Sequence, residues 1–139
     1  MADRNDWNRQ TIEAFRANEG KVGGMWEGRP LLLLTTTGAK SGQRRTNPMM
    51  YLREGKRLFV FASKGGAPTN PDWYHNLLAH PEVTVEIGNE KYHAIAKPVT
   101  GEERDKIYAK WAQMYPQFGE YQQKTTRKIP VIELEQVKG

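Results

Sequence analysis

Cysteine is absent from this chain of 139 residues. The absence of thiols excludes disulfides, cysteine nucleophiles, thiolate-bound zinc and cysteine-bound iron–sulfur clusters. Three enzyme signatures are also missing, namely the GxGxxG of dinucleotide-binding folds, the GxxxxGK[ST] phosphate loop and the GxSxG nucleophile elbow. His75, His80 and His93 show no spacing typical of metal ligands, so we expect no metal site.

Long apolar runs are missing as well. The longest, residues 31–34, has four leucines, whereas a membrane-spanning helix needs about 20 apolar residues. The first residues, MADRNDW, do not combine a basic stretch with an apolar one as a secretory leader does. We therefore expect a cytoplasmic protein, with peripheral contact between its N-terminal helix and the inner face of the membrane as an open alternative.

The formal net charge of +5 is concentrated in one part of the chain. Lys40, Arg44 and Arg45 fall within six residues, while the acidic residues lie mostly near the N-terminus and after position 82. A local excess of this kind favours a binding site for an anion over a general contribution to solubility.

Hydrophobic periodicity and turn residues predict one α+β domain over residues 1–139, with an N-terminal helix in 1–20 and a barrel in 30–136. We expect three or four helices, of which three are placed at residues 5–18, 70–80 and 101–116. About six strands are expected at residues 31–37, 47–53, 57–63, 83–87, 90–97 and 130–135. Local antiparallel pairing of short strands favours a closed barrel, because closure removes exposed edges.

Several local signals sharpen these expectations. Trp7, Ile12 and Phe15 recur at helical spacing, and the glycine-rich residues 21–30 are expected to form a loop. Two hairpins are expected, one with its turn at residues 53–56 and one at residues 88–89. The helix at 70–80 is expected to have Asn70 as its N-cap and Pro71 at its first position, and to end before Pro81. The following helix is expected to bury Ile107, Trp111 and Met114 on one face.

The segment GAKSGQRRTNP (38–48) has the composition of an anion-binding turn. Gly38 and Gly42 allow the backbone to bend, and the basic and hydroxyl side chains between them and beyond supply donors to phosphate or carboxylate oxygens. From residue types alone, a solvated basic turn between two strands is an equally good explanation.

A second candidate anion site is the glycine-rich run at residues 63–67, which follows an apolar strand and leads into the helix at 70–80. A loop of this kind can offer backbone N–H groups and the positive end of a helix dipole. An ordinary strand–helix connection is the alternative. Two such loops in one small domain favour a long phosphorylated ligand.

Four aromatic residues, Trp111, Tyr115, Phe118 and Tyr121, form a third feature. At helical spacing such residues more often pack a helix against the core than line a substrate site. However, Pro116 and Gly119 are expected to interrupt the helix here, which would suit a lid.

The segments TTTGAKSGQRRTNPMMYL, FASKGGAPTNPDWYHNLLAHPEVTVEIG, MYPQFGEYQ and IPVIELE together resemble the deazaflavin-dependent nitroreductase family. This is a branch of the F420-dependent split β-barrel oxidoreductases of actinobacteria, and the similarity covers residues 12–136 in order and spacing. It implies a split β-barrel like that of the FMN-binding proteins and an enzyme that passes a hydride from reduced F420 to electron-poor compounds. Quinones, α,β-unsaturated lactones and esters such as coumarins and aflatoxins, and nitro compounds are the implied substrates.

The resemblance also implies partners and a site. A separate F420-reducing dehydrogenase would supply the reduced cofactor, and the protein would be a monomer or a homodimer. Ser63, Tyr115 and Tyr121 are the candidate donors to the substrate oxygen. The substrate would contact Met50, Trp111 and Phe118. The residues implied to bind F420 are Ala39, Lys40, Ser41, Arg44, Arg45, Thr46, Asn47, Pro48, Met49, Met50, Phe61, Ala62, Ser63, Lys64, Asp72, Trp73, Tyr74, His75 and Asn76.

One departure from the family pattern bears on the substrate. Members that reduce nitroimidazole prodrugs carry tyrosines where this chain has Met50 and Phe118, which argues against nitroimidazole reduction. Two rival functions stay open: a split barrel that carries FMN, FAD or haem without F420 catalysis, and a nucleic-acid module that uses the basic turn. The second is disfavoured because aromatic residues do not alternate with the basic ones.

Overall fold

The computed structural model describes residues 4–18, 30–88 and 90–137. In these parts of the chain, four α-helices and a short 3₁₀ helix accompany seven strands. Their order is α1 (Arg4–Ala17), β1 (Leu31–Thr37), β2 (Arg44–Met50), β3 (Leu52–Glu54), β4 (Arg57–Phe61), η2 (Lys64–Gly66), α2 (Asp72–Ala79), β5 (Glu82–Ile87), β6 (Glu90–Val99), α3 (Gly101–Met114), α4 (Pro116–Lys124) and β7 (Val131–Gln136).

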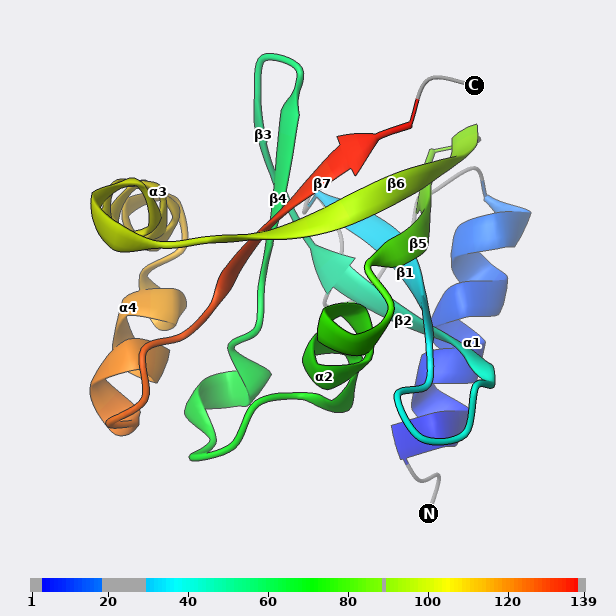
Figure 1. Cartoon of the computed structure of the whole chain (residues 1–139), viewed down its shortest axis with the longest axis horizontal. Helices are drawn as coiled ribbons and strands as arrows, with labels where there is room; N and C mark the ends of the chain where they lie inside the picture. Colours follow the sequence, from blue (N-terminus) through cyan, green and yellow to red (C-terminus); the bar gives the residue numbers. More distant parts are fainter. Residues whose placement is uncertain (1–3, 19–29, 89, 138–139) are drawn as a thin grey trace.

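The seven strands form one antiparallel sheet in the order β2-β1-β5-β6-β7-β4-β3. The sheet is strongly curled, with α1 at one end of it, α3 and α4 at the other, and α2 between them (Figure 1). Pairing is mostly between neighbours in the chain, and β7 joins the two halves by inserting between β6 and β4. The expected α+β class is therefore confirmed, but the sheet is a curled half-barrel with β2 and β3 at its edges rather than a closed barrel.

The number of strands differs from the expected six because the strand expected at 47–53 divides at Tyr51. Its first part, β2, pairs with β1, and its second part, β3, pairs with β4. β2 also begins earlier than expected, since its ladder with β1 extends to the pair Thr37 and Arg44. The strand at 31–37 agrees with the sequence, β4 ends two residues before the expected position 63, and β7 lies one residue later than the expected 130–135. Both expected hairpins form, β3 with β4 and β5 with β6, although Asn89 of the second expected turn lies outside the described residues.

The expected N-cap of α2 was wrong. Pro71 occupies the N-cap position, one residue before the helix, and no side chain caps the helix there. The Oδ1 atom of Asn70 instead accepts a hydrogen bond of 2.8 Å from Nη1 of Arg127. Because the side-chain oxygen of Asn70 accepts from this guanidinium, it does not accept from the first N–H groups of α2, which begins at Asp72 without a side-chain cap.

Two expectations about the aromatic region also failed. Met114 is 52% exposed rather than buried, because α3 ends there and the buried face consists of Arg104, Ile107, Tyr108 and Trp111. Gly119 does not interrupt a helix but lies inside α4, whereas the interruption expected at Pro116 is confirmed, since α3 ends at Met114 and α4 begins at Pro116.

The core is divided between two sides of the curled sheet. One cluster lies between the sheet and α2 and includes Leu34 and Leu77, and a second lies beneath α3 and α4 around Phe59 and Trp111. Within residues 4–18, 30–88 and 90–137, no helix combines the length and apolar character needed to cross a bilayer.

Helix α1 packs on the outer side of the sheet. Phe15 is buried against β1, with Ile12 packed beside it, and Arg16 forms two hydrogen bonds, of 3.0 and 2.8 Å, with the carboxylate of Glu86 on β5. The expected helix at 5–18 is therefore confirmed. The side chain of Trp7 and the loop expected at 21–30 lie outside the part of the chain that can be described, except for Pro30.

Gly66, at the end of η2, lies against α4 more closely than any other residue type allows. Its φ is +83°, and an added Cβ would lie 2.9 Å from the carbonyl oxygen of Tyr121. Gly55, in the β3–β4 hairpin, has a similar φ of +62° but open space around it. Comparing alanine substitutions at the two positions therefore separates the free-energy cost of a left-handed backbone conformation from the free-energy cost of a close contact.

We expect Gly66→Ala to destabilise the fold more than Gly55→Ala. The backbone conformation alone costs an L-residue about 1–2 kcal/mol, and at Gly66 the methyl group would also have to displace α4 from η2. Chemical unfolding should show a loss of about 1 kcal/mol for Gly55→Ala and at least about 2 kcal/mol for Gly66→Ala. Equal losses would contradict a tight contact between η2 and α4.

Candidate functional site

The turn between β1 and β2, residues 38–43, is closed by backbone hydrogen bonds. The amide of Gly38 donates to the carbonyl of Gln43 at 2.7 Å, and that of Gly42 donates to the carbonyl of Gly38 at 3.0 Å. The Oγ of Ser41 accepts from the amide of Gln43 at 3.1 Å and lies where a side chain at Gly38 would stand. Lys40 and Ser41 are consequently held at the exposed tip of a defined turn. We call this segment the β1–β2 turn.

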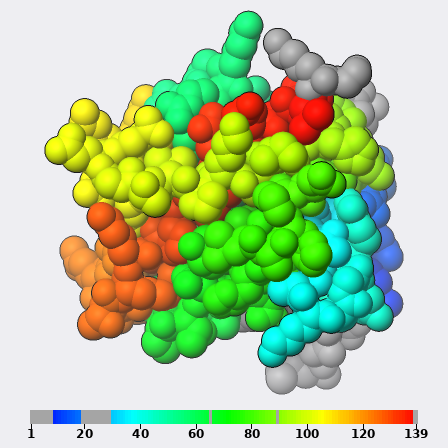
Figure 2. Space-filling view, viewed as in Figure 1, coloured from blue at the N-terminus to red at the C-terminus, as the bar shows by residue number. Residues whose placement is uncertain are grey.

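Asn76 fastens the β1–β2 turn to α2. Its Oδ1 accepts a hydrogen bond of 3.0 Å from the amide of Ala39, and its Nδ2 donates one of 3.2 Å to Oγ1 of Thr36. Figure 2 shows the β1–β2 segment (cyan) directly beside the α2 segment (green) on one face of the molecule. The structure thus brings Ala39 and Asn76, which are far apart in the sequence, into contact at the candidate site.

The structure separates the two adjacent arginines of β2. Arg45 pairs with Thr36, whose hydroxyl is bonded to Asn76, so Arg45 lies on the face of the sheet that carries α2. Side chains alternate along a strand, so Arg44 lies on the opposite face, where its Nη2 donates to the buried Oγ1 of Thr84 at 2.7 Å. Only Arg45 of the pair therefore shares a face with α2.

The same alternation divides the rest of β2. Asn47 and Met49 follow Arg45 on the α2 face, and Met49 packs against the cluster beneath α2. Thr46 lies on the other face, where its hydroxyl is 2.7 Å from that of Thr35. The remaining two residues implied by the resemblance, Pro48 and Met50, share the face of Thr46, and Met50 is buried.

The second candidate segment, residues 63–70, follows β4 and leads into α2. We call it the glycine loop. Lys64 has a φ of +48°, and its Nζ donates to Oγ1 of Thr69 at 3.2 Å. Ser63 is half-buried, while Ala62 before it is fully buried. Because the glycine loop precedes α2 and the β1–β2 turn is bonded to α2, the two anion-binding candidates flank one helix (Figure 1).

Sequence reasoning missed Arg127, which holds the glycine loop from behind. Its guanidinium donates to three carbonyls of this region, at Ala62, Ser63 and Ala67, and to the Oδ1 of Asn70. The partners lie 57 to 65 residues away in the chain. No local pattern could have indicated them.

The first turn of α2 contributes exposed and half-exposed side chains beside these loops. Asp72 and His75 are exposed, and Trp73 and Tyr74 are half-buried, with both aromatic rings packed on the cluster beneath the helix. The implied cofactor residues of α2 are thus divided into an outward polar pair and an inward aromatic pair.

The aromatic candidates lie mostly in the core. Phe61 and Trp111 stack with ring centroids 4.6 Å apart and an interplanar angle of 9°, and Trp111 is 0% exposed. Phe118 is also buried, at 8% exposure. Tyr115 and Tyr121 are half-buried at the edge of this cluster. Of the implied substrate contacts and donors on α3 and α4, the two tyrosines retain the most accessible surface.

Tyr108 ties α3 to α4 beneath these aromatics. Its hydroxyl donates a hydrogen bond of 2.6 Å to the carbonyl of Phe118. Desolvation by burial raises the pKa of Tyr108 to about 12, so the phenol stays protonated and keeps donating throughout the neutral range. The indole Nε1 of Trp111 is buried without a hydrogen-bond acceptor among the described residues.

The cations of the candidate loops, and Arg127 behind the glycine loop, have no carboxylate partner among the described residues. None of the ion pairs in the described part of the chain includes Lys40, Arg45, Lys64 or Arg127. The residues that do form such pairs are Arg16 with Glu86, Arg57 with Glu103 and Glu133, Lys97 with Glu135, Arg104 and Lys128 with Asp105, and Lys110 with Glu54. The cations flanking α2 therefore lack internal counter-charges, and this arrangement suits a long polyanionic ligand.

The family model described as F420H(2)-dependent quinone reductase matches residues 7–136. A Mycobacterium tuberculosis protein named F420H(2)-dependent quinone reductase is 40% identical over 126 residues, which cover 86% of this chain and 83% of that protein.

Two solved structures are similar in fold and sequence. One, described as an F420-H2 dependent reductase (FDR-A), has a TM-score of 0.70 and 44% identity and covers 77% of this chain and 95% of its own. The other, described as a domain-swapped dimer, has a TM-score of 0.72 and 39% identity and covers 96% of this chain and 100% of its own. Together with the curled antiparallel sheet, these likenesses confirm the split β-barrel. The chain thus belongs to the F420H(2)-dependent quinone reductase family, and the oxidoreductase class and the F420 cofactor implied by its sequence are confirmed with it.

Proposed function

We propose that this protein reduces quinones with F420H2, and that it holds the acidic end of the cofactor between the β1–β2 turn and the glycine loop. The observation that carries this assignment is the set of cations around α2 that have no carboxylate partner. Other described cations, such as Lys56, Lys91 and Lys106, also lack an ion pair, so what distinguishes the two loops is that their unpaired cations lie together around one helix. A phosphate and a glutamate tail would supply the missing negative charge.

The residues fit the cofactor in two groups. Lys40 and Ser41 on the β1–β2 turn, with Arg45 on the same side of the sheet as α2, would bind the phosphate and the carboxylates. Arg44 donates a hydrogen bond to Thr84 on the opposite face. It would therefore attract the anionic cofactor through its own positive charge at a distance, without contacting it. The remaining residues that we propose around the ribityl chain and the ring are Ala39, Thr46, Asn47, Pro48, Met49, Met50, Phe61, Ala62, Ser63, Lys64, Asp72, Trp73, Tyr74, His75 and Asn76.

When bound, reduced F420 would supply a hydride for an electron-poor carbon of the substrate. The task of the protein is to orient the reactants and to donate a hydrogen bond to the substrate oxygen as it gains negative charge. Ser63, Tyr115 and Tyr121 are the candidates. Tyr121 is favoured because its own backbone contacts the glycine loop at Gly66, which brings α4 next to the proposed cofactor site.

The substrate range that we propose includes quinones first and α,β-unsaturated lactones and esters, such as coumarins and aflatoxins, second. Apolar side chains select such flat molecules by shape. Met50 and Phe118 offer no hydroxyl where nitroimidazole-reducing relatives have tyrosines, so nitro compounds should be the weakest substrates. Because Trp111 and Phe118 are buried, we expect them to support this surface more than to touch the substrate.

We further propose that the protein works in the cytoplasm with a separate F420-reducing dehydrogenase that renews F420H2. The lack of cysteine is compatible with a reducing compartment. Peripheral membrane contact through α1 would have to use residues other than Ile12 and Phe15, which pack against the sheet. The proposed assembly is a monomer or a homodimer, and one solved relative is described as a domain-swapped dimer.

Removing the cations of the proposed tail site should weaken cofactor binding. Lys40→Ala and Arg45→Ala should each raise the dissociation constant for F420 by about tenfold or more, because hydrogen bonds to charged groups contribute about 1.5–3 kcal/mol. Fluorescence titration of the purified protein with F420 measures this constant.

Lys97→Ala is the matched control for this prediction. Lys97 is an exposed cation on β6 whose Nζ lies 2.6 Å from the carboxylate of Glu135, and its loss should change the dissociation constant by less than about twofold. A constant that stays unchanged in the Lys40 and Arg45 variants would remove the proposed tail site. Protein that fails to bind F420 but purifies with a flavin or haem would favour the carrier alternative.

Removing the hydroxyl of Tyr121 should slow turnover without weakening the cofactor. In Tyr121→Phe we expect kcat/KM for menadione to fall by about tenfold, the effect of losing one hydrogen bond in the transition state, with the F420 dissociation constant unchanged. Tyr115→Phe and Ser63→Ala should have smaller effects. Tyr108→Phe, which removes a buried hydroxyl outside the site, should lower the melting temperature alone. Normal turnover in Tyr121→Phe would contradict this role for Tyr121 and indicate that another group donates the hydrogen bond to the substrate oxygen.

A further inference from the structure

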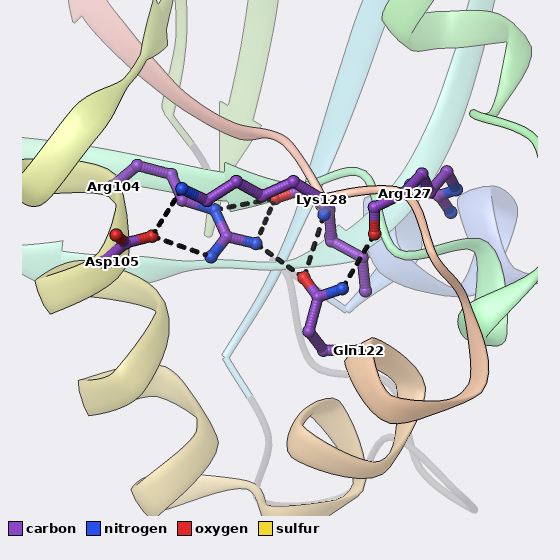
Figure 3. A network of polar contacts seen from close by, with 6 residues as sticks. Arg104, Asp105, Gln122, Arg127 and Lys128 are labelled. Carbon is purple, nitrogen blue, oxygen red and sulfur yellow. Dashed lines mark hydrogen bonds and ion pairs between the residues drawn. The ribbon is translucent and has the colours of Figure 1, made fainter.

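Arg127 lies in the segment between α4 and β7, and its side chain points away from this segment towards the glycine loop (Figure 3). Its Nε donates to the carbonyl of Ala67 at 2.9 Å, and its Nη2 donates to that of Ser63 at 2.8 Å. Its Nη1 donates to the carbonyl of Ala62 at 3.1 Å and to the Oδ1 of Asn70 at 2.8 Å. One guanidinium therefore binds four residues that enclose the loop.

All four partners are neutral oxygens, and no ion pair of the described residues includes Arg127. Desolvation by burial lowers the pKa of its guanidinium, which nevertheless stays charged at neutral pH. A positive charge of this kind is usually compensated by a carboxylate. Here the described residues provide only carbonyl and amide oxygens, so the guanidinium is held by hydrogen bonds to the loop and by no carboxylate.

The contacts of Arg127 reach both halves of the proposed cofactor site. It holds the loop around Lys64, whose φ of +48° is costly for a residue with a side chain. It also fixes Asn70, two residues before α2 begins, and α2 in turn fixes the β1–β2 turn through Asn76. Arg127 is therefore connected with the backbone at Ala39 through its hydrogen bond to Asn70, through α2, and through the hydrogen bond between Asn76 and Ala39.

We propose that Arg127 is a positioning residue for the cofactor: it sets the shape of the glycine loop and, through Asn70 and α2, the place of the β1–β2 turn. This inference rests on the proposed F420 site. It assigns to Arg127 no contact with the reacting atoms. Lysine cannot replace it fully, because an ammonium has no planar set of five N–H groups that can reach four oxygens at once.

Arg104 on α3 provides a matched control. Its Nε and Nη2 donate to the carbonyl of Ile129 at 3.1 and 2.7 Å, and its Nη2 also donates to the Oε1 of Gln122 at 2.7 Å. Gln122 in turn donates from Nε2 to the carbonyl of Arg127 (Figure 3). Both arginines thus hold the same segment, but only the side chain of Arg127 faces the glycine loop.

The test compares Arg127→Gln, Arg127→Lys and Arg104→Gln in the full chain, by F420 titration, steady-state kinetics with menadione and hydrogen–deuterium exchange of the ligand-free protein. In Arg127→Gln we expect the F420 dissociation constant and the KM for F420H2 to rise by about tenfold or more, with kcat within about threefold of wild type. Amide exchange should accelerate in residues 63–70. Arg127→Lys should show an intermediate rise.

Arg104→Gln should lower the melting temperature and accelerate exchange in residues 122–130, with the dissociation constant within about twofold of wild type. An unchanged constant in Arg127→Gln would overturn the proposal, as would an equal rise in Arg104→Gln, which would indicate general destabilisation. If Arg127→Gln does not fold, Arg127→Lys decides by the same comparison. Failure of the wild type to bind F420 would refute the proposed function instead, and exchange in residues 63–70 would still report whether Arg127 holds the loop.

Discussion

The antiparallel pairing of β1 with β2 determines where the candidate site can be. The ladder extends from Leu31 and Met50 to Thr37 and Arg44, so it leaves only residues 38–43 for the turn. Because directly paired residues share a face, Arg45 is placed with Thr36 above α2. The amide of Asn76 then joins this face to the turn. Shifting the register by one residue would turn Arg45, Asn47 and Met49 to the opposite face and bring Arg44 to the face of α2 in place of Arg45.

The absence of a counter-charge reduces the stability of the fold by different amounts for the different cations around α2. An exposed ion pair contributes only about 0–1 kcal/mol to stability, so leaving exposed side chains such as Lys40 and Arg45 without carboxylates costs the ligand-free protein little. Arg127 is more buried, and four neutral acceptors compensate for the water that it loses. The fold can therefore keep a positive surface for an anion without a large loss of stability.

Local features of the sequence predicted the fold well. The hairpins around Gly55 and Gly88, the strand at 31–37 and the helices depend on neighbouring residues, whose patterns can be read in a single chain. The boundary of β2 could not be read this way, since the composition of Arg44 and Arg45 suits a turn and only the ladder with β1 draws them into a strand. Met114 continued the helical pattern of α3, but the helix ends at that residue and leaves it exposed.

The candidate site was predictable in its segments but not in its connections. The two loops have compositions that indicate anion binding, whereas Arg127 comes from a polar stretch without such a signal. Its partners are brought to it by the sheet order, in which β7 lies beside β4 and the chain before β7 consequently passes behind the residues that follow β4. Contacts of this kind depend on topology and appear only when the fold is known.

The aromatic cluster shows why substrate selection in this protein should be loose. Phe61, Trp111 and Phe118 pack on one another in the core, and Tyr108, whose pKa is raised by burial, connects α3 to α4 by a hydrogen bond to the carbonyl of Phe118. These helices therefore present a stable surface whose polar groups are confined to its edge, at Tyr115 and Tyr121. A surface with few polar groups discriminates weakly between flat, electron-poor molecules, because few of its hydrogen-bonding groups would be left unpaired when a different molecule binds. Chemical selectivity must then come mainly from the cofactor, and the protein contributes chiefly through the accuracy with which the two loops hold it.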